Sequence, residues 1–218
     1  MKGTFITFEG IEGSGKSTHL ELAGQALAAR KYDVLLTREP GGTPVGDSLR
    51  RILLDPQNHN MDPTTELFLY AAARRQHIAQ VIGPALKREK IILCDRYVDA
   101  TTAYQGSARD LPEKLLRELN HIATEGLMPS LTLLFDCTVE VGLTRARKRN
   151  QQETLKGQDR FEREAFSFHE KVRSRYLSLA KADPQRIKII DTTHQNVHDI
   201  HAIVMKEILA HVGTHSRT

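Results

Sequence analysis

The sequence of 218 residues contains no long apolar run. A helix that spans a bilayer needs about 20 consecutive apolar residues, so we expect no transmembrane segment and no membrane partner. The first residues, from Met1 to Ile6, also lack the apolar region and the small-residue cleavage site of a secretory signal. They are typical of the start of a β-strand. We therefore expect a cytoplasmic protein.

Cysteine is scarce as well. Cys94 and Cys137 both lie in apolar runs with no potential metal ligand near them in sequence, which favours a role as small core residues in a reducing compartment. Three histidines, His194, His198 and His201, stand near the end of the chain. No cysteine or acidic cluster accompanies them at the spacing of zinc ligands, so we expect no metal there.

The composition is that of a globular domain. Hydrophobic residues make up 39% and charged residues 27% of the chain, and the formal net charge is +4. The length fits one domain, or one domain with a small mobile insert. Much of the positive charge falls in one stretch, which contains Arg145, Arg147, Lys148, Arg149, Lys156, Arg160 and Arg163. Such a cluster suits a polyphosphate as well as a nucleic-acid backbone, and composition leaves both open.

Strand-like and helix-like segments alternate along the chain. Strands are expected over residues 3–9, 33–37, 91–95, 130–136 and 186–191. Helices are expected over residues 16–30, 47–54, 63–88 with a bend near Gly83 and Pro84, 112–125, 139–181 with an interruption around 150–158, and 197–212. This alternation predicts an α/β domain of three layers, in which helices cover both faces of a five-stranded parallel sheet. We expect a single domain over residues 1–218, with a small helical lid at about 141–163 and a frayed tail from Gly213.

The first expected strand leads into the segment Gly10-Ile11-Glu12-Gly13-Ser14-Gly15-Lys16-Ser17, which matches the pattern G-x-x-x-x-G-K-[ST] without a mismatch. The glycines let backbone N–H groups turn inward around phosphate oxygens, and the next helix adds the positive end of its dipole. Lys16 can reach the β- and γ-phosphates, and the Ser17 hydroxyl can ligate Mg²⁺. A plain glycine-rich turn before a helix is the alternative. With a strand before it and a helix after it, the loop predicts a P-loop NTPase fold and a bound nucleoside triphosphate.

The rest of the chain narrows the class. The D-x-x-G and N-K-x-D motifs of regulatory GTPases do not occur, and the strand 91–95 ends in Asp95 followed by Arg96 rather than in paired acids. An acid followed by a base suits a site that neutralises a second substrate carrying a phosphate. One phosphate loop with scattered arginines therefore favours a small nucleoside or nucleotide kinase. A nucleic-acid-binding ATPase that uses the basic stretch is the alternative from another class.

The sequence resembles the bacterial thymidylate kinases. The residues that carry the resemblance are, in order, Phe8 to Thr18, Thr37-Arg38-Glu39-Pro40-Gly41-Gly42-Thr43, Tyr70 to His77, Asp95-Arg96-Tyr97, Ala103-Tyr104-Gln105-Gly106 and Asp159 to Glu162. The Thr37–Thr43 and Tyr104–Gly106 runs are more diagnostic than the glycine loop. The resemblance implies Mg²⁺-assisted transfer of a phosphoryl group from ATP to dTMP for dTTP biosynthesis. It also implies ATP and dTMP as small-molecule partners, no nucleic acid, and a homodimer.

Arginines and one carboxylate are expected around the acceptor phosphate. Arg38 follows the second strand in a turn rich in glycine and proline, where a guanidinium can grip a monophosphate. The resemblance gives the same role to Arg96 and, as a further candidate, to Arg50. Asp95 is expected to hold Mg²⁺ through water or to orient Arg96. A surface position for Arg38 and a structural ion pair for Asp95 are the alternatives.

The nucleoside part of the acceptor has its own candidates. In the family, a carboxylate at the position of Glu12 lies near the 3′-hydroxyl. Tyr70 and Arg74 lie four residues apart and so share a helix face. The resemblance implies that Tyr70 stacks on thymine, where phenylalanine is more usual, and that Arg74 donates a hydrogen bond to the base. Thr101 and Gln105 are expected beside the base.

The lid is expected to supply a catalytic cation. In bacterial members of the family the phosphate loop often lacks an arginine, as this one does, and an arginine of the lid then contacts the transferring phosphoryl group. Arg147, Arg149 and Arg160 are the candidates, and together with Lys16 and Arg96 they make up the expected catalytic residues. A solvated helix face is the alternative for any one of the lid arginines.

Overall fold

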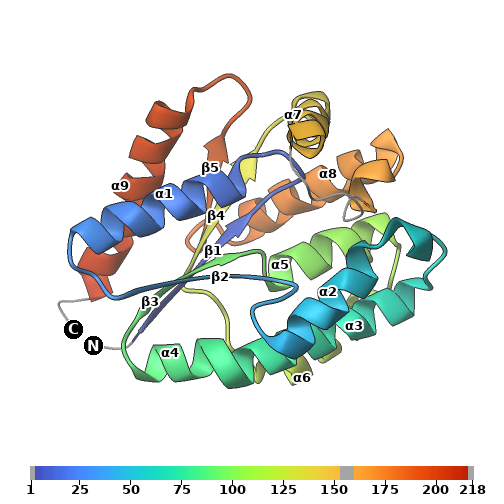
Figure 1. The fold of residues 1–218 in the computed structure, drawn as a ribbon, viewed down its shortest axis with the longest axis horizontal. Helices are drawn as coiled ribbons and strands as arrows, with labels where there is room; N and C mark the ends of the chain where they lie inside the picture. The colour runs from blue at the N-terminus through green and yellow to red at the C-terminus, as the bar shows by residue number, and fades with distance from the viewer. Residues whose placement is uncertain (1–2, 153–159, 216–218) are drawn as a thin grey trace.

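The computed structural model describes residues 3–152 and 160–215 (Figure 1). Its centre is a parallel sheet of five strands in the order β2-β3-β1-β4-β5. The strands are β1 Thr4–Glu9, β2 Val34–Arg38, β3 Ile91–Asp95, β4 Leu131–Asp136 and β5 Ile187–Asp191. All five predicted strands are confirmed.

Helices cover both faces of this sheet, which confirms the predicted three-layer α/β fold. The α-helices are α1 Lys16–Ala29, α2 Pro44–Leu54, α3 Pro63–His77, α4 Gly83–Lys87, α5 Val98–Thr101, α6 Glu113–Thr124, α7 Val139–Gln152, α8 Phe166–Ala182 and α9 Val197–His215. Shorter 3-10 and π segments are η1 Pro56–Asn58, η2 Ile78–Ile82, η3 Thr102–Ala108 and η4 Phe161–Arg163. Helices α1 and α9 lie together on one face (Figure 1). None of the helices in the described ranges is long and apolar enough to cross a membrane.

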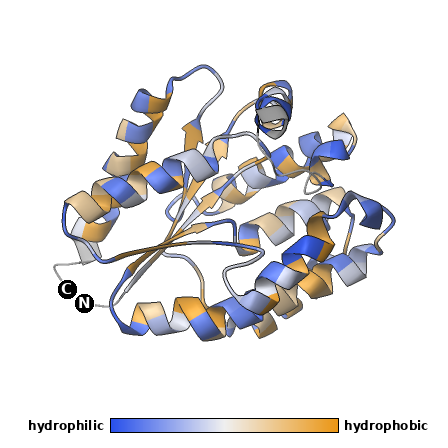
Figure 2. Cartoon of the chain, viewed as in Figure 1, coloured by the Kyte–Doolittle hydropathy of each residue, from blue (hydrophilic) through white to orange (hydrophobic). Residues whose placement is uncertain are grey.

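The core lies on both sides of the sheet because successive strand residues point to opposite faces. Ile6 and Phe8 of β1 pack with α1 and α9, whereas Phe5 packs with Ile82 and Tyr97 on the other face. The strands and the inward sides of the helices are the most hydrophobic parts of the chain (Figure 2). The cysteines Cys94 and Cys137 are buried and free, as the sequence predicts.

Several helix boundaries differ from the prediction. Helix α2 begins at Pro44 rather than at 47, because the Thr43 hydroxyl caps it by accepting from the Gly46 N–H at 2.9 Å, and proline suits the first helical position. The expected bend near Gly83 takes the form of the π segment η2 just before it, which accommodates the missing N–H and the ring of Pro84. Helix α9 continues to His215, so the tail is helical beyond Gly213.

Candidate active site

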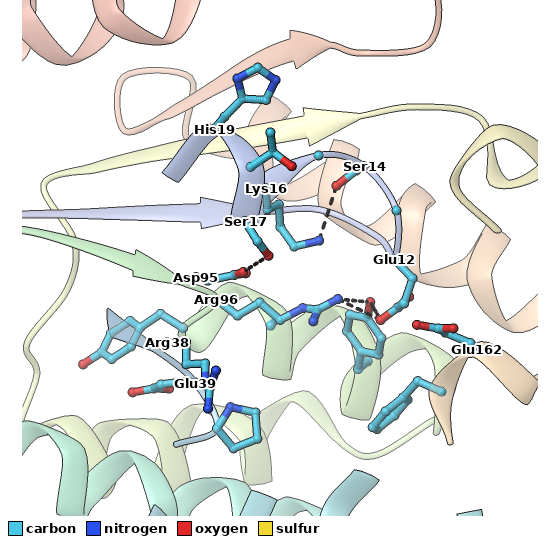
Figure 3. Close-up of a pocket in the computed structure, with 18 of the residues that line it drawn as sticks. Glu12, Ser14, Lys16, Ser17, His19, Arg38, Glu39, Asp95, Arg96 and Glu162 are labelled. Carbon is cyan, nitrogen blue, oxygen red and sulfur yellow. Dashed lines mark hydrogen bonds and ion pairs between the residues drawn. The ribbon is translucent and has the colours of Figure 1, made fainter. Parts of the chain in front are cut away.

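Most of the predicted site residues line one cavity at the carboxyl ends of the strands (Figure 3); Gly10, Ile11, Arg147 and Arg160 do not. Its volume is about 810 Å³, within the range of small-molecule sites. The phosphate loop, the ends of β2 and β3, helices α3 and α7, and the loop between β5 and α9 contribute to its wall. Parallel sheets bind ligands at this edge, so the fold places the loop where the sequence predicts a ligand.

The phosphate loop depends on its glycines. Gly10, Gly13 and Gly15 have positive φ angles of 140°, 69° and 97°, which side chains of L-residues rarely tolerate. A Cβ atom on Gly13 would lie 2.0 Å from the carbonyl oxygen of Gly142 in α7. The loop therefore also packs closely against the helix that begins the predicted lid.

Lys16 belongs to the loop, and its side chain is buried. Its Nζ donates to the Ile11 carbonyl oxygen at 2.7 Å and to Ser14 Oγ at 3.3 Å. Burial, together with the nearby Arg96 guanidinium, lowers the pKa of Lys16 to about 8. An anion brought to this loop would favour the charged ammonium, so the site is suited to phosphate.

Ser17 and Asp95 approach each other beside the loop. Ser17 Oγ donates to Asp95 Oδ2 at 2.6 Å, and Asp95 Oδ1 is buried without a hydrogen-bond partner among the described residues. Magnesium prefers such oxygen ligands and usually takes few of them from the protein, the rest coming from phosphates and water. The two side chains therefore fit the predicted Mg²⁺ position. In the described ranges no three His, Cys, Asp or Glu side chains gather as a metal cage.

Three predicted arginines lie in one part of the cavity wall. Arg38, Arg50 and Arg96 all line it. Arg50 donates to the Pro40 carbonyl oxygen at 3.1 Å, and Arg38 lies 3.8 Å from Asp47. Burial lowers the pKa of Arg50 to about 10, and repulsion from Arg38 and Arg96 adds to the shift. A buried cation whose pKa is lowered by like-charged neighbours marks a site for an anion.

Glu12 and Arg96 form the centre of a buried cluster (Figure 3). Glu12 Oε1 accepts from Arg96 Nη2 and from the Tyr104 hydroxyl, each at 2.7 Å, and its Oε2 lies 3.4 Å from Nδ1 of the buried His169. Burial would raise the pKa of Glu12, but Arg96, His169 and Lys16 outweigh it and hold the pKa far below its usual range. Arg96 has a φ of 68°, a left-handed backbone that is unusual outside glycine and is typical of functional sites.

The expected base-binding residues lie together on the far side of the cavity. Tyr70, Arg74, Thr101 and Gln105 all line it. Arg74 is buried, and its Nε donates to Glu39 Oε2 at 2.8 Å, while Nη2 donates to Thr101 Oγ1 at 2.9 Å. Further bonds run from Nη2 to the Tyr97 carbonyl oxygen at 3.2 Å and from Nη1 to Asn120 Oδ1 at 2.7 Å. These bonds occupy all but one of the N–H groups of the guanidinium.

The lid arginines take three different positions. Arg149 lines the cavity and donates to Glu162 Oε1 at 2.8 Å. Arg147 is exposed and is not among the residues that line the cavity. Arg160 is buried away from it, where it pairs with Glu66 and donates to the Leu53 carbonyl oxygen at 2.8 Å. The structure thus brings only Arg149 of the three candidates into the cavity. Most of the predicted interruption at about 150–158 lies outside the described residues, which omit 153–159.

Several residues in the cavity wall or packed behind it were missed in the sequence. Arg145 lines the cavity and donates to the Thr192 carbonyl oxygen at 3.0 Å. Tyr104 and His169 surround Glu12, although Tyr104 belongs to a run that carries the family resemblance. Glu9, at the end of an apolar strand, accepts from the Tyr97 N–H and the Tyr176 hydroxyl at 2.7 Å each. Burial and then the charge of Asp99 raise the pKa of Glu9 to about 8. An acid that ends an apolar strand is a signal in the sequence that could have identified Glu9.

The fold and the site together define a P-loop phosphotransferase, with a triphosphate loop and an arginine-lined anion site in one cavity. The family model for thymidylate kinase matches residues 8–204. The chain belongs to the thymidylate kinase family.

Relatives and a solved structure agree with this membership. The thymidylate kinase of Geotalea uraniireducens is 50% identical over 211 residues, which cover 97% of this chain and 99% of that protein. The thymidylate kinase of Pelobacter propionicus is 50% identical over 207 residues, covering 95% and 94%. A crystal structure of thymidylate kinase from Ehrlichia chaffeensis superposes with a TM-score of 0.76 at 31% identity, covering 95% of this chain and 99% of that one.

Proposed function

We propose that this chain transfers the γ-phosphoryl group of ATP to dTMP, with Mg²⁺, and so forms ADP and dTDP for dTTP biosynthesis. The observation that carries the proposal is the shared cavity, in which the loop ending at Lys16 faces the cluster of Arg38, Arg50 and Arg96. A phosphate monoester is largely ionised at neutral pH, so the acceptor needs no strong general base. The chain's contribution is to align two anions and to neutralise their charge.

The donor side is assigned to the loop and its neighbours. Backbone N–H groups from Gly10 to Ser17 and the Lys16 ammonium hold the phosphates. Ser17 and Asp95 are the residues that would hold Mg²⁺, which supplies charge neutralisation between the β- and γ-phosphates when it is bound. Arg145 donates to the carbonyl oxygen of Thr192, whose hydroxyl donates to the Ser14 carbonyl oxygen of the loop at 3.1 Å, and this supports a role for Arg145 on the donor side.

The acceptor side is assigned to residues on the opposite wall and to Glu12, whose side chain extends from the loop to Arg96. Arg38, Arg50 and Arg96 would grip the monophosphate, because their mutual repulsion falls when an anion enters. The Glu12 carboxylate is charged and can accept from the 3′-hydroxyl. Tyr70 can stack on the base.

The remaining base contacts come from three buried side chains. The one N–H of Arg74 left over by its internal bonds can donate to a base carbonyl. Thr101 and Gln105 line the same part of the cavity. Thr101 accepts from Arg74 and so holds the guanidinium in place.

A coupled ADP assay with dTMP, UMP, CMP, AMP and GMP tests the acceptor. The expected result is turnover with dTMP at a kcat/KM at least about tenfold above that with any other monophosphate, because one or two hydrogen bonds to the base contribute about that much discrimination. Preference for another monophosphate would identify a different nucleotide kinase. ATP hydrolysis that nucleic acid stimulates, without any acceptor, would favour the nucleic-acid-binding ATPase instead.

Replacing Arg74 is expected to weaken the binding of dTMP far more than the binding of ATP. Arg74→Ala would also leave Glu39 buried without its cation, at a cost of about 3–5 kcal/mol, so Arg74→Lys is the better variant because it keeps the charge. We expect the KM for dTMP to rise roughly 10- to 100-fold, the value of a hydrogen bond from a charged group, while the KM for ATP stays within about threefold. Steady-state kinetics with each substrate varied in turn measures both.

The neighbouring Arg75 provides the control for this prediction. Arg75 is half exposed and pairs with Glu125 on the surface, so Arg75→Lys should leave both KM values unchanged. An equal rise in KM for dTMP and ATP in Arg74→Lys would argue against a base contact.

We also propose a homodimer and a cytoplasmic location. Helix α3 packs between α2 and α6, and all three carry exposed large apolar side chains, Ile52, Phe68 and Ile122 among them. Exposed apolar side chains gathered on neighbouring helices are typical of a subunit interface.

The proposed cytoplasmic location rests on the cysteines. The free thiols of Cys94 and Cys137 suit a reducing compartment.

Phe68→Asp is expected to convert the dimer to a monomer. A charge at the centre of an apolar interface loses its hydration without gaining a partner, which costs several kcal/mol and so weakens association by roughly 10³-fold or more. Light scattering during size-exclusion chromatography measures the mass. Ile203→Asp on α9 is the control, since its side chain is also exposed but lies on the opposite face of the sheet. A wild-type protein that is monomeric at high micromolar concentration would refute the dimer.

A further inference from the structure

Glu66 is a fully buried carboxylate that the proposed reaction does not use. It lies near the start of α3, one turn before Tyr70, and none of its side chain is exposed. Its Oε1 accepts from Gln105 Nε2 at 2.7 Å, and its Oε2 accepts from Arg160 Nη2. Arg109 approaches both oxygens, at 3.5 and 3.4 Å. A single carboxylate thus has partners in η3, directly after η3, and in the last part of the predicted lid.

The charge of Glu66 fixes the orientation of the Gln105 amide. Its carboxylate lies against the guanidinium groups of Arg109 and Arg160, and a carboxylate paired with two cations accepts hydrogen bonds and donates none. Only the NH₂ end of the amide can therefore face Glu66. The carbonyl oxygen of Gln105 is left for the cavity that this residue lines.

The two arginines also fix Glu66 itself. Arg160 is held a second time by the Leu53 carbonyl oxygen of α2, and Arg109 is held by Glu164 at 2.5 Å. Arg109 further packs over the ring of Phe168, with 4.8 Å between the guanidinium carbon and the ring centre. Anchored on both sides, the carboxylate cannot follow a rotation of Gln105. This rigidity is what a positioning group requires.

We infer that Glu66 is a specificity-determining positioning residue, which turns the Gln105 carbonyl oxygen toward the N3–H group of a thymine-type base. Thymine and uracil carry a hydrogen-bond donor at N3, whereas cytosine carries an acceptor there. A fixed acceptor on the protein therefore favours the first class and repels the second. The inference rests on the proposed function, in which dTMP is the acceptor.

The test is the ratio of kcat/KM for dTMP to that for dCMP in Glu66→Gln. The new amide can accept from or donate to Gln105, so the Gln105 side chain gains a second orientation. We expect the ratio to fall about tenfold, the value of one hydrogen bond, through a higher KM for dTMP with the KM for ATP unchanged. An unchanged ratio in the folded variant would overturn the inference. If Glu66→Gln does not fold, Glu66→Asp keeps the charge for both arginines but withdraws it from Gln105, and the same outcomes apply.

Two further variants separate positioning from general damage. Arg109→Gln removes only the longer contacts to the carboxylate, at 3.5 and 3.4 Å, and leaves Arg160 to hold Glu66 against Gln105. The ratio should therefore stay within about twofold of the wild-type value, and a fall equal to that of Glu66→Gln would mean that loss of the ion cluster is the cause. In a Gln105→Leu background, Glu66→Gln should no longer change the ratio, and a persisting change would show that Glu66 does not act through Gln105. Failure of the wild-type protein to phosphorylate dTMP would instead refute the proposed function itself.

Discussion

Lys16→Ala is expected to reduce kcat by about 10³-fold or more, the loss typical of removing a preorganised cation from a phosphoryl-transfer site. The Lys16 ammonium is buried at the base of the cavity, and its only hydrogen bonds in the described structure are to the loop itself, at Ile11 and Ser14. Its pKa of about 8 shows that burial leaves the charge poorly compensated. The transferring phosphoryl group would supply the missing anion, so the lysine should stabilise the transition state strongly.

Lys90→Ala is the matched control for this loss. Lys90 pairs with Asp33 at 2.8 Å, and the two residues directly precede β3 and β2, at the end of the sheet opposite the cavity, so its removal should leave kcat unchanged. The coupled ADP assay gives kcat for both variants, and calorimetry gives their affinity for dTMP. Because Lys16 lies on the donor side, dTMP should still bind to Lys16→Ala. Near-normal turnover in this variant would contradict the assigned role of the phosphate loop.

The fold was predictable because its signals are local. The run Ile91-Ile92-Leu93 is uniformly apolar, as expected of a strand buried on both faces, and the glycine loop marks the first strand-to-helix turn. The alternation of such strands with helices then leaves few topologies open. The π segments η2 and η3 were not predictable, since a π turn arises from a local misfit in the helix and has no propensity signal of its own.

A site residue could be predicted only where a local motif indicates its role. The loop motif predicts Lys16 and Ser17, and the end of β3 predicts Asp95. The partners of Glu12 do not, because Tyr104 and His169 reach it only through the packing of α8 against η3. The pairing of Arg160 with Glu66 is equally remote in sequence, and it gives this arginine a buried partner that its place in the predicted lid did not indicate.

The lid arginines show a signal that the sequence contained. Positions four apart on a helix share a face, whereas positions two apart point to different sides. Arg145 and Arg149 are four apart and both line the cavity, whereas Arg147 between them does not. Helical spacing alone could therefore have paired Arg149 with Arg145 rather than with Arg147.

Arg149→Ala is expected to lower kcat by about 10³-fold, the lower end of the contribution of an arginine that stabilises charge in phosphoryl transfer. Its guanidinium lines the cavity, and α7 is pressed against the phosphate loop where Gly13 meets Gly142. The present partner of Arg149 is Glu162, and the arginine side chain is nearly half exposed, so the pair contributes little stability and can be exchanged for a phosphate. The KM values should change much less than kcat, because the contact strengthens in the transition state.

Arg147→Ala and Arg160→Ala complete the comparison. Arg147 lies on the same helix, exposed and outside the cavity lining, so its removal should change kcat by less than about threefold. Arg160→Ala leaves Glu66 buried with one guanidinium fewer, so we expect a loss of roughly 3–5 kcal/mol in unfolding free energy, measured by urea denaturation. If Arg147→Ala or Arg160→Ala lost kcat while remaining stably folded, and Arg149→Ala did not, the catalytic cation would lie elsewhere in the lid. The three variants thus distinguish chemistry from folding at neighbouring arginines of one segment.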